Sequence, residues 1–168
     1  MHNLQGTTTM ARLTEDQISF LSKGLAHQIG SVTADGRPCL VRGLGADLCD
    51  DGRVMVLLSA ESGFEVLDAI RATGKVALNL TSPANYQSLS LKGVDAVVEH
   101  AGAPYRALLL DRQEGFRTNL IPLGFPLEYT DSMYSVPDEQ LVMVRFTPML
   151  AWNQTPGPGA GKPVALQE

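Results

Sequence analysis

The chain has 168 residues, a length that suits one domain with a full hydrophobic core and no need of disulfide staples. Apolar residues make up 44% and charged residues 18%, which excludes a disordered chain. The net charge of -5 argues against a general nucleic-acid or membrane-surface binder, because both need a basic face. An anionic cofactor needs only a few local cations and backbone N–H groups.

The cysteines and the chain ends favour a reducing compartment. Cys39 and Cys49 belong to no CxxC pair or Cys/His cluster, so we expect small buried side chains. The sequence has no apolar run of the ~18 residues that a membrane span needs, and residues 1–10 are polar, without a signal-peptide core. We therefore expect a cytoplasmic protein, with a flexible N-terminus over 1–12, one domain over 13–154 and a glycine-proline tail over 155–168.

The first half of the chain predicts a helix followed by a meander of strands. Thr14 and Gln17 form a capping box before apolar residues at helical spacing, which predicts a helix over 14–25. Asp35-Gly36 and Asp51-Gly52 are tight-turn signals between apolar runs. They predict strands over 27–33, 38–47 and 53–59, of which the last is apolar enough to be covered on both faces.

The second half predicts more strands and two further helices. A helical stripe over 62–73 has Ser62 as a possible N-cap and Gly74 at its end. Strands are predicted over 75–81, 86–91, 93–100 and 140–147, a helix over 104–115, and an irregular segment with a helical turn over 116–138. Short strands joined by tight turns indicate a mainly β fold, an antiparallel barrel with helices at its rim.

Two stretches are candidate anion sites. The residues Ser59-Ala60-Glu61-Ser62-Gly63 join a strand to a helix, where hydroxyls and free N–H groups suit a phosphate. The alternative is that Ser62 only caps the helix. Arg42 stands in an apolar strand, where it must reach solvent or an anionic partner.

Other chemistries have little support in the residue pattern. His2, His27 and His100 are far apart and form no HxxxH or HExxH motif, which argues against a metal site. The chain has no GxSxG elbow, and residues 157–161 lack the Lys-Ser/Thr of a P-loop. The single Trp152 follows the last predicted strand, either as a packing anchor or as a stacking partner for an aromatic ligand.

The order of these motifs resembles the pyridoxamine 5′-phosphate oxidase-like, FMN-binding split barrels. The matching pieces are Leu13-Thr-Glu-Asp-Gln17, Ile29-Gly-Ser-Val-Thr33, Asp35-Gly-Arg-Pro38, Leu40-Val-Arg42, Gly52-Arg-Val-Met-Val56, Lys75-Val-Ala-Leu-Asn79 and Tyr86-Gln-Ser-Leu-Ser-Leu-Lys-Gly93. The similarity covers residues 13–100, and then the strand over 140–147 with Thr155-Pro-Gly157 behind it. The specificity lies in their order and spacing.

The resemblance implies a six-stranded antiparallel split β-barrel that forms a homodimer. It implies FMN in two clefts at the dimer interface and a flavin-dependent oxidoreductase acting on a small organic substrate. The implied cofactor-binding residues are Arg42, Ser59, Ala60, Ser62, Gln87, Ser88 and Trp152. No catalytic residue follows from the resemblance.

One departure from the family pattern bears on the cofactor. Many relatives place Lys after the Ser that opens the helix, whereas this chain reads Ser62-Gly-Phe-Glu65. The missing cation weakens the expected phosphate pocket by ~1–3 kcal/mol if the pair is well shielded. True pyridoxamine phosphate oxidase activity is therefore not predicted. The alternatives are deazaflavin as the cofactor, a non-catalytic flavin- or haem-binding barrel with His27 or His100 to examine as the haem ligand, and a barrel without cofactor.

Overall fold

Two antiparallel sheets form the body of the protein. The computed structural model describes residues 12–167, so the flexible N-terminus expected over 1–12 lies almost wholly outside the described residues. One sheet has six strands in the order β10-β9-β6-β5-β1-β2, and the other has four in the order β3-β4-β8-β7. The strands are β1 (Ala26–Val32), β2 (Pro38–Gly43), β3 (Gly45–Leu48), β4 (Val54–Ser59), β5 (Val76–Thr81), β6 (Ser88–Gly93), β7 (Val97–His100), β8 (Leu141–Phe146), β9 (Leu150–Asn153) and β10 (Lys162–Val164).

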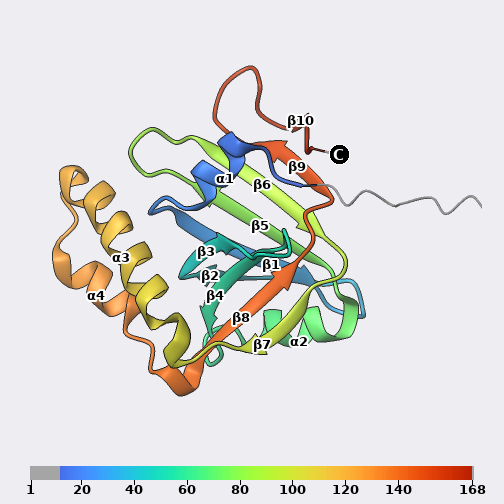
Figure 1. The fold of residues 1–168 in the computed structure, drawn as a ribbon, viewed down its shortest axis with the longest axis horizontal. Coiled ribbons are helices and arrows are strands. Elements are labelled where there is room, and N and C mark those ends of the chain that lie inside the picture. The colour runs from blue at the N-terminus through green and yellow to red at the C-terminus, as the bar shows by residue number, and fades with distance from the viewer. Residues whose placement is uncertain (1–11, 168) are drawn as a thin grey trace, which may run out of the picture.

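Four helices complete the fold, and they lie on different sides of the sheets (Figure 1). They are α1 (Glu15–Leu21), α2 (Phe64–Thr73), α3 (Arg106–Leu120) and α4 (Leu127–Tyr134), with short 3-10 turns at Ala103–Tyr105, Ile121–Leu123 and Asp138–Gln140. None of the helices in the described part of the chain has the length and apolar character of a membrane span.

The main core fills the space between the two sheets. Ile29, Leu78 and Leu91 from the six-stranded sheet meet Val56 and Phe146 from the four-stranded one, and all five are fully buried. Complete burial of such side chains stabilises the fold by ~1.5–3 kcal/mol each. Helices α1 and α2 pack their own apolar residues into the same core, through Phe20, Leu21, Val66, Leu67 and Ile70.

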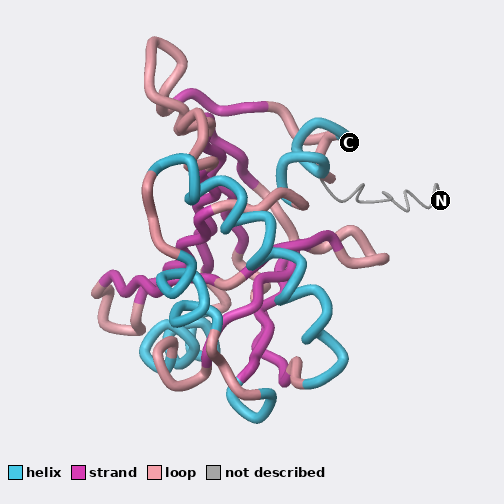
Figure 2. The backbone as a smooth tube through the Cα atoms, turned by 90° about the vertical axis from the view of Figure 1, so that its left-hand side faces the viewer, coloured by secondary structure: helices cyan, strands magenta, loops and turns pink. Residues whose placement is uncertain are grey.

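A second core lies on the outer face of the four-stranded sheet, beneath α3 and α4. Leu57 and Met143 from the sheet pack there with Leu109 and Phe116 of α3 and Tyr134 of α4. In Figure 2, the view from this side, the helices lie in front of the strands. Strand β4 is therefore buried on both faces, as its continuous apolar run predicts.

Several sequence predictions are confirmed at their key residues. Thr14 and Gln17 form the predicted capping box of α1, and Gly74 ends α2 in the left-handed region at φ 67°. The predicted Ser62 N-cap is wrong, because α2 begins one residue later, at Phe64 with Gly63 as N-cap, and no side chain caps it. The Ser62 N–H instead donates to the Ser59 hydroxyl at 3.4 Å.

The predicted strand over 38–47 is interrupted, because the chain turns there from one sheet to the other. The residues on both sides of this corner are glycines, because a side chain would not fit there. A Cβ on Gly43 would lie 2.9 Å from the His27 Cβ, and a Cβ on Gly45 would lie 2.8 Å from the Arg112 side chain. Strand β2 therefore ends in the six-stranded sheet and β3 begins in the four-stranded one.

The remaining differences concern boundaries and missed elements. The first helix ends at Leu21 rather than at 25, and strand β6 runs over 88–93 and β7 over 97–100, where strands over 86–91 and 93–100 were predicted. Helix α3 extends to Leu120, and α4 occupies much of the segment predicted as irregular. Strands β9 and β10 were not predicted, and β10 lies within the expected glycine-proline tail and pairs with β9.

The packing of α3 in the second core gives a matched pair of stability predictions. Leu109 is 0% exposed and Leu110 is 52% exposed, although they are adjacent. We expect Leu109→Ala to lower the free energy of unfolding by about 2–4 kcal/mol, because it leaves a cavity against the four-stranded sheet. Leu110→Ala should change it by less than ~0.5 kcal/mol. Urea denaturation of both variants measures the difference, and equal losses would show that α3 is packed in a different way.

Candidate functional site

The outer face of the six-stranded sheet carries a row of polar side chains. Residues paired across neighbouring strands project from the same face. Arg42 of β2 lies opposite Gln28 of β1, and Gln28 lies opposite Asn79 of β5. Asn79 in turn lies opposite Ser90 of β6, and Ser90 opposite Trp152 of β9. The polar row is therefore Arg42, Gln28, Asn79, Ser90 and Trp152, on the face turned away from the core.

The row beside it is mostly apolar and exposed. The residues of this row are paired across the same five strands, and each lies two positions along its strand from a residue of the polar row. They are Leu40, Gly30, Ala77, Lys92 and Leu150. The Leu40 side chain is 63% exposed and that of Leu150 is 52% exposed. Apolar side chains therefore stand exposed at both ends of this row. We call the polar row and this neighbouring row together the open face.

Two hollows lie on the open face. One of 690 Å³ is lined by Gly30, Leu40, Ala77 and Lys92, among others. The other, of 340 Å³, is lined by Gly93, Val94, Met149 and Leu150. Both hollows are also lined by Lys75, Val76 and Lys92, so they are neighbours along the same surface.

The charge of the six-stranded sheet differs in sign from that of the whole chain. None of the residues in its six strands is Asp or Glu, whereas the strands carry Arg42, Lys92 and Lys162. The chain as a whole has a net charge of -5. Arg42 and Lys92 project from the open face, which therefore presents positive charge to an anionic ligand.

Trp152 is the aromatic member of the polar row. The Lys92 ammonium lies 6.0 Å from the centre of its indole ring, within range of a cation–π contact. Its indole N–H is buried and has no hydrogen-bond partner among the described residues. A buried donor of this kind is normally satisfied, and the acceptor is a water, a ligand or a second chain.

The structure brings some of the predicted cofactor residues together and leaves others apart. Arg42 and Trp152 share the polar row. Ser88 pairs with Thr81 on the same face, and its hydroxyl donates to the Thr81 hydroxyl at 3.0 Å. Gln87 immediately precedes β6.

The three other predicted residues lie at the junction of β4 and α2. Ser59 ends a strand of the four-stranded sheet, and the Ala60 N–H donates to the Gln140 carbonyl at 2.8 Å. The junction carries the carboxylates of Glu61 and Glu65 and no cation between residues 59 and 65. A phosphate would therefore meet like charge here, and the backbone groups of Ala60 and Ser62 are already engaged.

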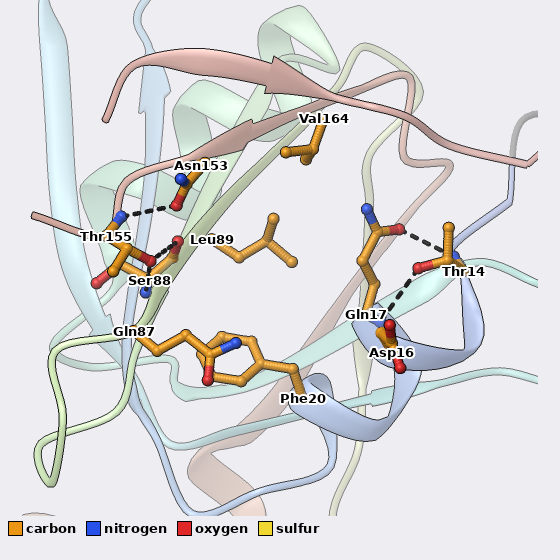
Figure 3. A pocket seen from close by; sticks show the side chains of 10 residues that line it. All are labelled: Thr14, Asp16, Gln17, Phe20, Gln87, Ser88, Leu89, Asn153, Thr155 and Val164. Carbon is orange, nitrogen blue, oxygen red and sulfur yellow. Dashed lines mark hydrogen bonds between the residues drawn. The ribbon is translucent and has the colours of Figure 1, made fainter. Parts of the chain in front are cut away.

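Gln87 and Ser88 also border a pocket of 250 Å³ on the other side of the sheet, beneath α1 (Figure 3). Its polar groups are used within the fold: Gln17 bonds the Thr14 N–H, the Asn153 oxygen accepts from the Thr155 N–H, and the Thr155 hydroxyl accepts from the Ser88 N–H. Its lining residues include Asp16 and no Lys, Arg or His. The pocket therefore does not suit an anion.

Sequence reasoning missed the middle of the open face. Gln28, Asn79, Ser90 and Lys92 each interrupt an apolar run at alternate positions, which is a signal of outward-facing strand residues. That signal places each residue on one face of its strand, but it does not reveal that the pairing of β1, β5 and β6 brings the residues of these three strands side by side.

His27 lies on the opposite, core-facing side of β1 and is 1% exposed. Neither of its ring nitrogens has a hydrogen-bond partner in residues 12–167. Burial, together with the positive charges of Arg42 and Arg112, lowers the pKa of His27 to about 3. His27 is therefore neutral and enclosed, which does not suit a haem ligand that must reach a large planar group.

The low pKa of His27 predicts a loss of stability in mild acid. The unfolded chain takes up a proton below its pKa of 6.5, whereas the folded chain does so only near 3. The unfolded state therefore binds more protons between these values, and stability falls as the pH falls. We expect this residue to remove about 2 kcal/mol of unfolding free energy between pH 7.5 and pH 5.

The measurement is urea denaturation at both pH values for the wild type, His27→Leu and His100→Gln. Between pH 7.5 and pH 5, the unfolding free energy of His27→Leu should fall by about 2 kcal/mol less than that of the wild type. His100 is exposed, so His100→Gln should keep the decrease. An unchanged decrease in His27→Leu would mean that His27 is not held neutral.

Comparisons with known proteins agree on the fold. No family model matches the sequence, and no curated protein matches it. Among solved structures, HupZ of Group A Streptococcus superposes with a TM-score of 0.54 at 15% identity, covering 89% of this chain and 99% of that one. A protein of Lactobacillus delbrueckii, provisionally assigned as a pyridoxamine 5′-phosphate oxidase, superposes with a TM-score of 0.50 at 15% identity, covering 84% and 93%. The chain has the split-barrel fold of the pyridoxamine 5′-phosphate oxidase-like proteins.

Proposed function

We propose that two copies of this chain bind FMN between their open faces and use it as a flavin-dependent oxidoreductase on a small organic substrate. The observation that carries the proposal is the open face itself. It combines exposed leucines, a polar row whose indole N–H has no partner in residues 12–167, and cations without carboxylates in the strands of the sheet. A flavin needs an apolar surface for its ring, hydrogen-bonding groups for its edge and cations for its phosphate.

Each part of the open face has a role in this proposal. Trp152 offers a ring for stacking, and Asn79 offers a hydrogen-bonding amide in the same row, on the far side of the buried Ser90. Arg42 and Lys92 offer positive charge to the phosphate. Ser59, Ala60 and Ser62 stay proposed phosphate contacts, supported by their place at a strand–helix junction but opposed by Glu61 and Glu65.

The bound flavin would supply the electron and hydride chemistry. The chain's own part is to orient the flavin and substrate and to exclude water where the two open faces meet. We assign no general acid or base, and we do not propose true pyridoxamine phosphate oxidase activity. The cytoplasmic location also stays a prediction.

The cofactor is tested by the absorbance spectrum of the purified protein and by thermal melts with added FMN. A ligand that binds only the folded state stabilises it by ~2.7 kcal/mol at 100 times its dissociation constant, which gives a clear rise in Tm. We expect a flavin spectrum or that rise. A sharp Soret band would replace FMN with haem, stabilisation by deazaflavin alone would replace it with that cofactor, and no response to any of them would leave a barrel without cofactor.

The dimer is tested by a matched pair of charge insertions. Leu150 lies on the open face and Leu123 follows α3, and their side chains are 52% and 50% exposed. Leu150→Asp should convert the dimer to a monomer and abolish FMN binding, because it buries a carboxylate in the interface. Leu123→Asp should keep both properties. Light scattering coupled to size exclusion reads the mass, and a dimer that survives Leu150→Asp would place the interface elsewhere.

A further inference from the structure

The pocket beneath α1 lies on the core-facing side of the six-stranded sheet (Figure 3). Leu89 of β6 lies opposite Asn153 of β9, and Val164 of β10 lies opposite Ala151 of β9. Residues paired in this way share a face of the sheet, and both Leu89 and Ala151 belong to the main core. The sheet therefore separates this pocket from the open face, so a ligand in the pocket is distinct from the flavin of the proposed function.

Three of the lining side chains are apolar. Phe20 of α1 is 4% exposed, Leu89 of β6 is 8% exposed, and Val164 of β10 is half-buried. They offer a surface on which an apolar or aromatic group loses its contact with water. The cavity measures 250 Å³, which is less than most sites for drug-sized ligands have, so the ligand has a body of about one ring.

The loop between β5 and β6 forms one wall of the pocket and is held in a strained turn. Tyr86 has a φ of 59°, and no other non-glycine residue within 12–167 has a positive φ. The Tyr86 N–H donates to the Ser82 carbonyl at 2.9 Å, and the Ser82 N–H donates to the Gln87 carbonyl at 2.9 Å. These bonds maintain a costly backbone conformation, as is common at ligand sites, and they fix the backbone of the lining residue Gln87.

Asp16 is the charged group of the pocket. It is the one lining residue with a formal charge, and none of the ion pairs within residues 12–167 uses it. The adjacent Gln17 is already engaged, because it accepts from the Thr14 N–H and donates to the Ala165 carbonyl at 3.0 Å. Lys23 lies near the Phe20 ring but does not line the pocket. The carboxylate is therefore open to a cation from outside.

We propose that this pocket binds a small organic ammonium ion, an amine on an apolar or aromatic body. The ammonium donates to the Asp16 carboxylate, and the body lies against Phe20 and Leu89, with the Gln87 amide as the remaining polar group. Asp16 comes from α1 and Gln87 from the loop before β6, so the ligand joins the two elements (Figure 3). An anion would meet like charge here, and a neutral ligand would leave the carboxylate without a counter-ion.

The test is a titration of the full chain with benzylamine, which is protonated at neutral pH, followed by the amide shifts in NMR spectra. The variant is Asp16→Asn, and the matched control is Glu15→Gln. Glu15 is the other carboxylate in the first turn of α1 and is also exposed, but it does not line the pocket. We expect saturable shifts in the wild type, at least threefold weaker binding in Asp16→Asn and wild-type binding in Glu15→Gln.

Benzyl alcohol and benzoate, which have the same ring, test the charge of the ligand. Benzyl alcohol should bind the wild type at least threefold more weakly than benzylamine, and benzoate should give no saturable shift. Asp16→Lys should reverse this order by losing benzylamine and gaining benzoate. Melting curves check that each variant is folded.

The proposal is overturned if benzylamine does not saturate the wild type or binds Asp16→Asn with equal affinity. An equal loss in Glu15→Gln would also overturn it, because the effect would then come from net charge rather than from the pocket. Saturating FMN should leave the benzylamine shifts in place, since the two sites lie on opposite faces of the sheet. Competition between FMN and benzylamine would place the amine on the open face and overturn the assignment, whereas a failure of FMN to bind would bear only on the proposed function.

Discussion

The rest of the structure depends on the unequal covering of the two sheets. The four-stranded sheet is buried on both faces, by the main core on one side and by α3 and α4 on the other. The six-stranded sheet is buried only on its inner face, and its outer face presents Leu40 and Leu150 to solvent. Because the four helices of the described residues lie elsewhere, this face stays uncovered by helices, and it is the face that we propose for the ligand and the partner.

The corner between β2 and β3 connects the two environments. Gly43 and Gly45 allow the chain to pass from the exposed sheet to the covered one. Arg42 stands just before this corner, so its guanidinium reaches from the open face to Phe116 on α3. The open face and the helical cover therefore meet at the Arg42 side chain.

Much of the fold could be predicted from the sequence because its signals are local. The Thr14–Gln17 capping box, the Gly74 helix end and the apolar run of β4 each depend on a few adjacent residues. Strands β9 and β10 are short and include Pro163, so they lack the alternation that identifies a strand. Helix α4 was hidden in a segment rich in proline, and its Tyr134 is buried by tertiary packing that no local pattern reveals.

The candidate site was predictable only in part, because it depends on register. Arg42 and Trp152 were singled out as an unusual cation and the single tryptophan. That they share one row, and that Gln28, Asn79 and Ser90 lie between them, follows from pairing across five strands. Ser59 and Ser62 were selected because they join a strand to a helix, and again on the resemblance; the Ser62 N–H donates to the Ser59 hydroxyl, and Glu61 lies between the two residues.

Lysine reactivity toward an acetylating reagent, read by mass spectrometry with and without FMN, tests the central claim most directly. The chain has four lysines, of which Lys75 and Lys92 line the hollows of the open face and Lys23 and Lys162 lie elsewhere. If FMN binds between two open faces, Lys75 and Lys92 should lose reactivity while Lys23 and Lys162 keep theirs. Unchanged reactivity at Lys75 and Lys92 with saturating FMN would contradict the assignment of this face.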